Sequence, residues 1–114
     1  MNGMTLDAVP AHVNGWIEVS EQGATLILRI GGELDTASCK AIEPTISDAI
    51  ATATSVIIDL AELTFCDSSG VGLFIATHGK AVSDGTALAI RNVRQPVRRI
   101  FEITNLDAVI ELIE

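Results

Sequence analysis

The sequence predicts an α/β domain in which helices pack against a mixed β-sheet of four to five strands. Two observations support this class. Short runs rich in Val, Ile and Leu alternate with longer segments whose apolar residues recur at helical spacing, which is typical of strands joined by crossover helices. The first two runs are separated by a short turn that contains glycine, which predicts an antiparallel hairpin. A chain of 114 residues, 48% of them hydrophobic, suits one such domain.

The N-terminal part is expected to contain an irregular extension followed by the hairpin. Residues 1–14 are interrupted by glycine, proline and asparagine, so the domain itself is expected at residues 15–114. Strands are predicted at Trp16–Val19 and Ala24–Ile30, the second because its apolar residues alternate with period 2. The two glycines at 31–32 are expected to break this second strand.

A helix is predicted from Thr36 to Ala51. Asp35 precedes it, and aspartate is a preferred N-cap because its carboxylate accepts hydrogen bonds from unpaired backbone N–H groups. Pro44 conflicts with this helix, since a proline in a helix interior costs about 3 kcal/mol. We therefore expect a kink or two shorter helices. The apolar positions at helical spacing are Ala41, Ile42, Thr45, Ile46, Ala49 and Ile50.

The remaining elements continue the alternation of strand and helix. In chain order they are a strand at Ser55–Leu60, a helix from about Ser69 to Val82, a strand at Thr86–Arg91, a helix from Pro96 to Thr104 and a short strand at Val109–Ile113. Proline suits the first position of a helix, and Asn105 is expected to end the last one. Later strands joined through helices imply a mixed sheet.

Two stripes are predicted along the helix that begins near Ser69. One stripe is expected to cover the sheet and comprises Val71, Phe74, Ile75, His78 and Val82. Leu73 and Ala76 lie on another side, so Leu73 is expected to be semi-exposed. A single leucine on a surface is common, and a docking residue for a partner is the alternative.

The most informative segment is Asp-Ser-Ser-Gly-Val-Gly at residues 67–72, which follows the apolar run Leu63–Cys66. It predicts a strand end, a tight turn and the start of a helix, since Asp caps helices and Gly permits close turns. Ser68 is expected to be exposed at the cap, with Ser69 pointing more into the helix. A phosphate on Ser68 would be tolerated at the positive end of the helix dipole and would add about −1.5 to −2 charges.

This segment resembles the phosphorylation motif of the STAS-domain anti-sigma factor antagonists. Gly-Glu-Leu-Asp at residues 32–35 is similar to the second signature of that family, and the similarity in pattern extends from about Trp16 onward. The resemblance implies a STAS fold with Ser68 as the phosphorylated residue. It places Asp67, Ser69, Gly70 and Asp35 beside the phosphorylation site.

The resemblance also implies partners. The unphosphorylated form would bind an anti-sigma factor that is also a serine kinase of the ATP-binding, histidine-kinase-like type, and a sigma factor would be released. Phosphorylation of Ser68 would end binding until a phosphoserine phosphatase restores it. The implied partner-binding residues are Leu73, Gly72, Ala76 and Glu33. Two alternatives stand for Asp67 and Asp35: helix caps only, or carboxylates beside Ser68 that bind the kinase's Mg²⁺ or tune phosphorylation.

Composition excludes several functions. A formal net charge of −8 argues against binding to nucleic acid or to anionic membranes. No apolar run has the length of a membrane span and no signal peptide is evident, so a cytoplasmic protein is expected. Cys39 and Cys66 lack the spacing of metal ligands, so small buried side chains are expected, with a redox role for Cys66 as the alternative. No cofactor or metal is predicted.

A non-enzyme is expected. Ser68 as a hydrolase nucleophile would need a base, and the only histidines are His12 in the extension and His78 two turns along the helix. The chain also has no Gly-x-Ser-x-Gly elbow. Two rival functions remain open: a STAS subunit of a membrane transport or lipid-trafficking complex, and a weak nucleotide-binding module.

Overall fold

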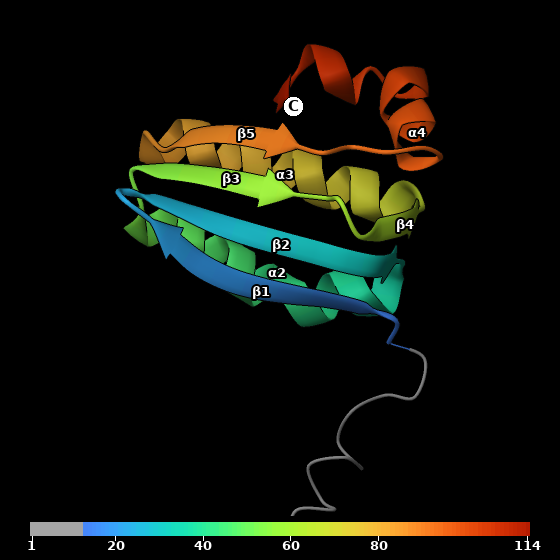
Figure 1. Ribbon diagram of the computed structural model, residues 1–114, viewed down its shortest axis with the longest axis horizontal. Helices are drawn as coiled ribbons and strands as arrows, with labels where there is room; N and C mark the ends of the chain where they lie inside the picture. The colour runs from blue at the N-terminus through green and yellow to red at the C-terminus, as the bar shows by residue number, and fades with distance from the viewer. Residues whose placement is uncertain (1–12) are drawn as a thin grey trace, which may run out of the picture.

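The computed structural model of the chain describes residues 13–114 and has a six-stranded mixed sheet (Figure 1). The predicted α/β class is confirmed. The elements in chain order are β1 (Gly15–Gln22), β2 (Thr25–Leu34), α2 (Thr36–Thr52), β3 (Ser55–Asp59), β4 (Leu63–Cys66), α3 (Ser68–Asp84), β5 (Ala87–Arg91), α4 (Val97–Ile103), the short 3₁₀ helix η1 (Leu106–Ala108) and β6 (Glu111–Ile113). Most of the expected extension at residues 1–14, His12 included, lies outside the described residues.

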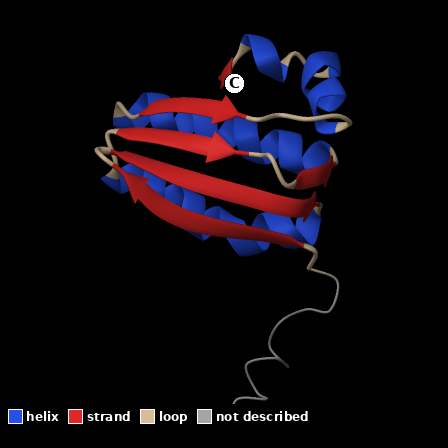
Figure 2. Cartoon of the chain, viewed as in Figure 1, coloured by secondary structure: helices blue, strands red, loops and turns tan. Residues whose placement is uncertain are grey.

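The sheet carries its long helices on one face. Its strand order is β1-β2-β3-β5-β6, with β4 paired to the end of β2, and only β1 is antiparallel to its neighbour. Figure 2 shows α2 and α3 behind the strands, while α4 and η1 lie on the side of the sheet that carries β5 and β6. The short β4 brings the number of strands above the expected four to five, because the apolar run before the Asp-Ser motif pairs as a strand of its own. Within residues 13–114, no helix has the length and apolar character needed to cross a membrane.

The core fills the space between the sheet and its two long helices. Its largest fully buried side chains include Leu28, Ile30, Ile46, Ile50, Ile58, Phe74, Ile90 and Phe101. Phe74 of α3 meets Phe101 of α4 edge to face, with ring centroids 5.5 Å apart, so α4 is attached to the same core. Burying such side chains supplies about 1.5–3 kcal/mol each, which makes this layer the main source of stability.

The predicted break in the second strand is wrong, since β2 continues through both glycines to Leu34. Gly31 is needed because the ring of Trp16 lies against it, and a Cβ at Gly31 would come within 2.1 Å of that ring. Gly32 has a φ of +79°, and the register with β4 shifts at this point. The two glycines therefore bend the strand without ending it.

Pro44 lies inside one continuous helix, so the alternative of two shorter helices is wrong. Pro44 itself is exposed, while Ile42, Ile46 and Ile50 are buried under the sheet. Each of these isoleucines contributes about 1.5–3 kcal/mol by burial, and together they exceed the roughly 3 kcal/mol that an interior proline costs.

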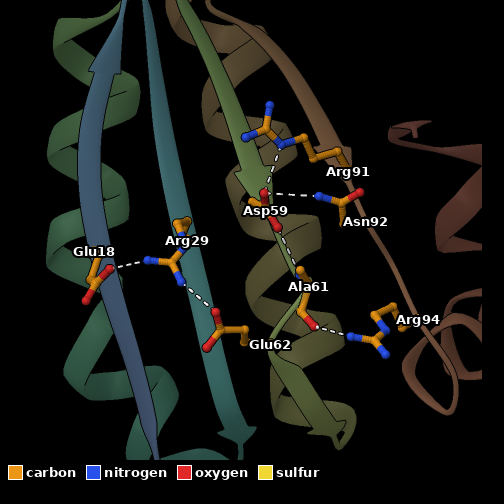
Figure 3. Close-up of polar contacts among 8 residues, drawn as sticks. All are labelled: Glu18, Arg29, Asp59, Ala61, Glu62, Arg91, Asn92 and Arg94. Carbon is orange, nitrogen blue, oxygen red and sulfur yellow. Dashed lines mark hydrogen bonds and ion pairs between the residues drawn. The ribbon is translucent and has the colours of Figure 1, made fainter.

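A polar network on the open face of the sheet holds the link from β3 to β4 (Figure 3). The buried carboxylate of Asp59 accepts hydrogen bonds from the Ala61 N–H at 2.9 Å, from Arg91 at 2.9 Å and from Asn92 at 3.1 Å. Burial by itself would raise the pKa of Asp59, but these hydrogen bonds and the charge of Arg91 hold the pKa below its usual value. Glu62 in the same link accepts from Arg29 of β2 at 2.7 Å, and Arg29 also pairs with Glu18 of β1. The start of β4 is thus tied to the sheet.

Candidate functional site

Two loops that each join a strand to a helix lie side by side at one end of the sheet. Leu34 at the end of β2 pairs with Cys66 at the end of β4, and the Asp67 N–H donates to the Leu34 carbonyl at 3.1 Å. Asp35 and Asp67 follow these strand ends directly. The structure therefore brings together the two predicted motifs, which are more than 30 positions apart in the sequence.

Asp67 is the N-cap of α3, as predicted. Its Oδ1 accepts from the backbone N–H groups of Ser69 at 2.8 Å and Gly70 at 3.4 Å. Ser68 is the first helical residue and is exposed, whereas Ser69 is half-buried, so the predicted difference between the two serines is confirmed. Among residues 13–114 the Ser68 hydroxyl has no hydrogen-bond partner. It is the accessible hydroxyl of the motif.

Asp35 caps α2 in the same manner. Its Oδ1 accepts from the Ser38 N–H at 2.9 Å, and the Ser38 hydroxyl in turn accepts from the Asp35 N–H at 2.9 Å, which forms a capping box. The two helix starts are joined by a hydrogen bond of 2.8 Å between the hydroxyls of Thr36 and Ser69. Thr36 was not predicted from the sequence as part of the site. The pair Asp35-Thr36 nevertheless repeats the pattern of an aspartate followed by a hydroxyl residue that Asp67-Ser68 shows. The cap role of both aspartates is confirmed, and a role in binding Mg²⁺ stays a prediction.

Gly70 lets the start of α3 approach the two strand ends closely. A Cβ at Gly70 would lie 2.4 Å from the Cys66 sulfur and 3.1 Å from the Leu34 Cβ. Gly72, two residues further, is exposed and has no neighbouring atom within 4 Å of its Cβ position. The first glycine is therefore required by packing, whereas the second is not required by anything in the described fold.

We predict that Gly70→Ala lowers the free energy of unfolding by about 1–2 kcal/mol, since overpacking outweighs the gain in helix propensity. Gly72→Ala is the matched control and should raise the free energy of unfolding by about 0.5–1 kcal/mol. Urea denaturation followed by circular dichroism measures both. Equal stability of the two variants would contradict the close packing of Gly70.

The predicted orientation of α3 is only partly right, since Val71 and Phe74 of the predicted stripe are buried but other members are not. Leu73 is not semi-exposed but 8% exposed, and Ile75 and Val82, which were expected to cover the sheet, are 51% and 68% exposed. Leu73 lines a small pocket between α2 and α3 together with Ile46, Ile50, Ala76 and other residues. Because α3 packs against α2 as well as the sheet, its buried stripe is rotated by roughly 85° from the predicted one, at 100° per residue.

The exposed surface around Ser68 therefore differs in one position from the expected set. Glu33, Gly72 and Ala76 are exposed, as a role in partner binding requires. Ile75 takes the place expected for Leu73 as a large apolar side chain exposed on this part of α3. Ile75 lies seven residues after Ser68, which is about two helical turns, so both residues are on the same side of α3. This spacing is visible in the sequence, but the predicted stripe placed Ile75 on the side that faces the sheet.

The two cysteines beside the site are buried, as predicted. Burial, with a smaller effect from the carboxylates of Asp67 and Asp35, raises the pKa of Cys39 to about 11. Burial, with the nearby Cys39 and Asp67, raises the pKa of Cys66 to about 12. Both thiols are therefore protonated at neutral pH, which makes them poor nucleophiles.

Comparisons with known proteins bear on the family and the fold of this chain. The sequence model of the STAS domain family matches residues 17–114. A relative from Staphylococcus aureus, the anti-sigma-B factor antagonist, is 30% identical over 91 residues, which cover 79% of this chain and 84% of the relative.

Solved structures share the fold over most of the chain. An anti-sigma factor antagonist from Mycobacterium paratuberculosis matches with a TM-score of 0.81 at 24% identity, covering 91% of this chain and 89% of the other. The anti-sigma factor antagonist SpoIIAA in its unphosphorylated form matches with a TM-score of 0.73 at 26% identity, covering 87% and 89%. The Bacillus protein SpoIIAA in its phosphorylated form matches with a TM-score of 0.67 at 25% identity, covering 87% and 92%.

Proposed function

This chain belongs to the STAS domain family, and on that basis we propose that it is an anti-sigma factor antagonist controlled by phosphorylation of Ser68. The unphosphorylated protein binds an anti-sigma factor in the cytoplasm, and this binding releases a sigma factor. The anti-sigma factor is also a serine kinase of the ATP-binding, histidine-kinase-like type. It phosphorylates Ser68, binding ends, and a phosphoserine phosphatase reverses the modification. The chain is the protein substrate of this cycle and supplies no catalytic group.

The exposed Ser68 hydroxyl is the observation that carries the proposal. It stands at the first position of α3, has no partner among the described residues and is held in place by the cap of Asp67. Ser69 is less available because it is half-buried and hydrogen-bonded to Thr36. The names of the relatives support an antagonist of an anti-sigma factor as the biological context.

A phosphate on Ser68 acts in this proposal as a surface charge. An anion at the start of a helix is neutral or mildly stabilising, by about 0.3–1 kcal/mol, so the domain stays folded. The likeness of this chain to SpoIIAA in both its phosphorylated and its unphosphorylated form supports this view. Phosphorylation therefore weakens binding by placing like charges and an unpaired anion at the contact.

The partner contacts in this proposal surround Ser68 on the outer side of α3. Gly72 and Ala76 allow a close approach of the partner, and Ile75 offers an apolar contact. Glu33 at the end of β2 borders the same surface. Leu73 contributes indirectly, by holding α3 against α2.

We predict that the cognate kinase with Mg-ATP adds one phosphate to this chain, on Ser68. Ser68 is expected to be the acceptor because its hydroxyl is exposed to the kinase and has no hydrogen-bond partner among the described residues. Fragment mass spectrometry of the product locates the phosphate, with Ser68→Ala as the control that should remain unmodified. A phosphate on Ser69 or Thr64 would overturn the assignment.

A further inference from the structure

Positive charge is concentrated in one short segment of this acidic chain. The stretch from Arg91 to Phe101 contains four of the seven basic residues and no Asp or Glu, although the whole chain has a net charge of −8. Three of these residues, Arg94, Arg98 and Arg99, are named here the arginine cluster. The cluster begins in the loop after β5 and continues into the first turn of α4.

The charges of the cluster are not neutralised within the described chain. Arg91 is paired with the carboxylate of Asp59, but Arg94 and Arg98 donate only to the carbonyl oxygens of Ala61 and Val93, at 3.2 and 3.1 Å (Figure 3 shows the contact of Arg94). Arg99 is exposed and has no partner between residues 13 and 114. None of the three forms an ion pair with a carboxylate of residues 13–114.

This arrangement does not favour folding. Arg98 and Arg99 stand in the first turn of α4, where cations oppose the helix dipole, and no acidic residue accompanies them. Pro96 at the N-cap provides no side-chain hydrogen bond. The three like charges also repel one another. The described fold uses Arg94 and Arg98 for single hydrogen bonds to carbonyl oxygens but pairs none of the three positive charges with a carboxylate of residues 13–114, which leaves these charges available to a group outside the fold.

The helix that carries most of the cluster packs beside the strand that leads to Ser68. The helix α4 packs against β4, and β4 ends one residue before Asp67. Arg94 contacts the link that leads into β4, and Phe101 fixes α4 against Phe74 of α3. Figure 1 shows α4 at the same end of the sheet as β4 and the start of α3. A partner seated on Ser68 would therefore have the cluster at its edge.

We propose that Arg94, Arg98 and Arg99 attract an acidic surface of the anti-sigma factor and guide its approach to Ser68, an inference that rests on the proposed function. A chain with a net charge of −8 repels an acidic partner everywhere except at such a patch, so the patch also selects the orientation of approach. A phosphate on Ser68 adds negative charge facing the same acidic surface. The arginine cluster thus attracts the partner, and a phosphate on Ser68 repels the same partner.

The anti-sigma factor is first captured with the Ser68→Ala variant and purified. The association rate constant between this anti-sigma factor and the chain is then measured by stopped flow at about 20 mM and about 300 mM salt. Arg99→Glu should lower the association rate constant about fivefold at low salt, leave the dissociation rate unchanged within about twofold, and differ little from the unaltered chain at high salt. Arg99→Lys should restore the rate. The matched control is Lys80→Glu, which makes the same change of net charge at a residue that pairs with Asp84 near the other end of α3.

Several outcomes would overturn the inference. Equal slowing by Arg99→Glu and Lys80→Glu would mean that only net charge matters, and faster association of Arg99→Glu would mean that the partner surface is basic. Self-association of the chain alone that Arg99→Glu abolishes would assign the cluster to a second copy. If the unaltered chain does not bind the anti-sigma factor at all, the proposed function fails as well, whereas normal binding with an unaffected association rate removes only this inference.

Discussion

Ser68→Asp should bind the anti-sigma factor at least about 100-fold more weakly than Ser68→Ala, a difference of about 2.8 kcal/mol. The alanine variant loses only a hydroxyl that has no partner in the described fold, so its affinity should equal that of the unmodified protein. The aspartate adds a charge at the contact, where like charges forced together cost several kcal/mol. Isothermal titration calorimetry of both variants gives the difference.

The matched control for this experiment is Ser83→Asp. Ser83 is also exposed on α3 but lies 15 residues further along, roughly 22 Å away at 1.5 Å per residue. Its affinity should stay within about threefold of the unmodified protein. Equal affinity of Ser68→Ala and Ser68→Asp would instead favour a STAS subunit that binds its partner constitutively.

Leu73→Asp should lower the free energy of unfolding by at least about 3 kcal/mol, a large part of the 5–15 kcal/mol typical of a small domain. The leucine is 8% exposed between α2 and α3, so the substitution removes its apolar contacts and places a carboxylate in a largely buried position. Urea unfolding followed by the fluorescence of Trp16, the single tryptophan, measures the loss.

Ile75→Asp separates this effect from partner binding. Ile75 is 51% exposed, so the same carboxylate should change the free energy of unfolding by less than about 1 kcal/mol. Under the proposed function it should weaken binding of the anti-sigma factor at least tenfold, since it removes an apolar contact about two helical turns from Ser68 on the same side of α3. If Ile75→Asp instead lowered the free energy of unfolding strongly and Leu73→Asp did not, α3 would have the orientation predicted from its periodicity.

Features that depend on neighbours in the chain could be predicted from the sequence by itself. The caps formed by Asp35 and Asp67 were predictable because a side chain and the N–H groups it accepts from lie within three residues of each other. Asn105, with a φ of 60°, ends α4 for a similarly local reason. The alternation of strands and helices, and with it the α/β class, follows from periodicity in the same way.

Features that depend on a distant partner were decided only by the tertiary structure. The strand β2 passes through Gly31 because Trp16 of the neighbouring strand covers it, and α2 tolerates Pro44 because the burial of its isoleucines outweighs the cost of the proline. The rotation of α3 that buries Leu73 and exposes Ile75 depends on contact with α2, which periodicity along one helix does not contain. The pairing of β2 with β4 joins two motifs into one site around Ser68, because strand register is a property of two segments at once.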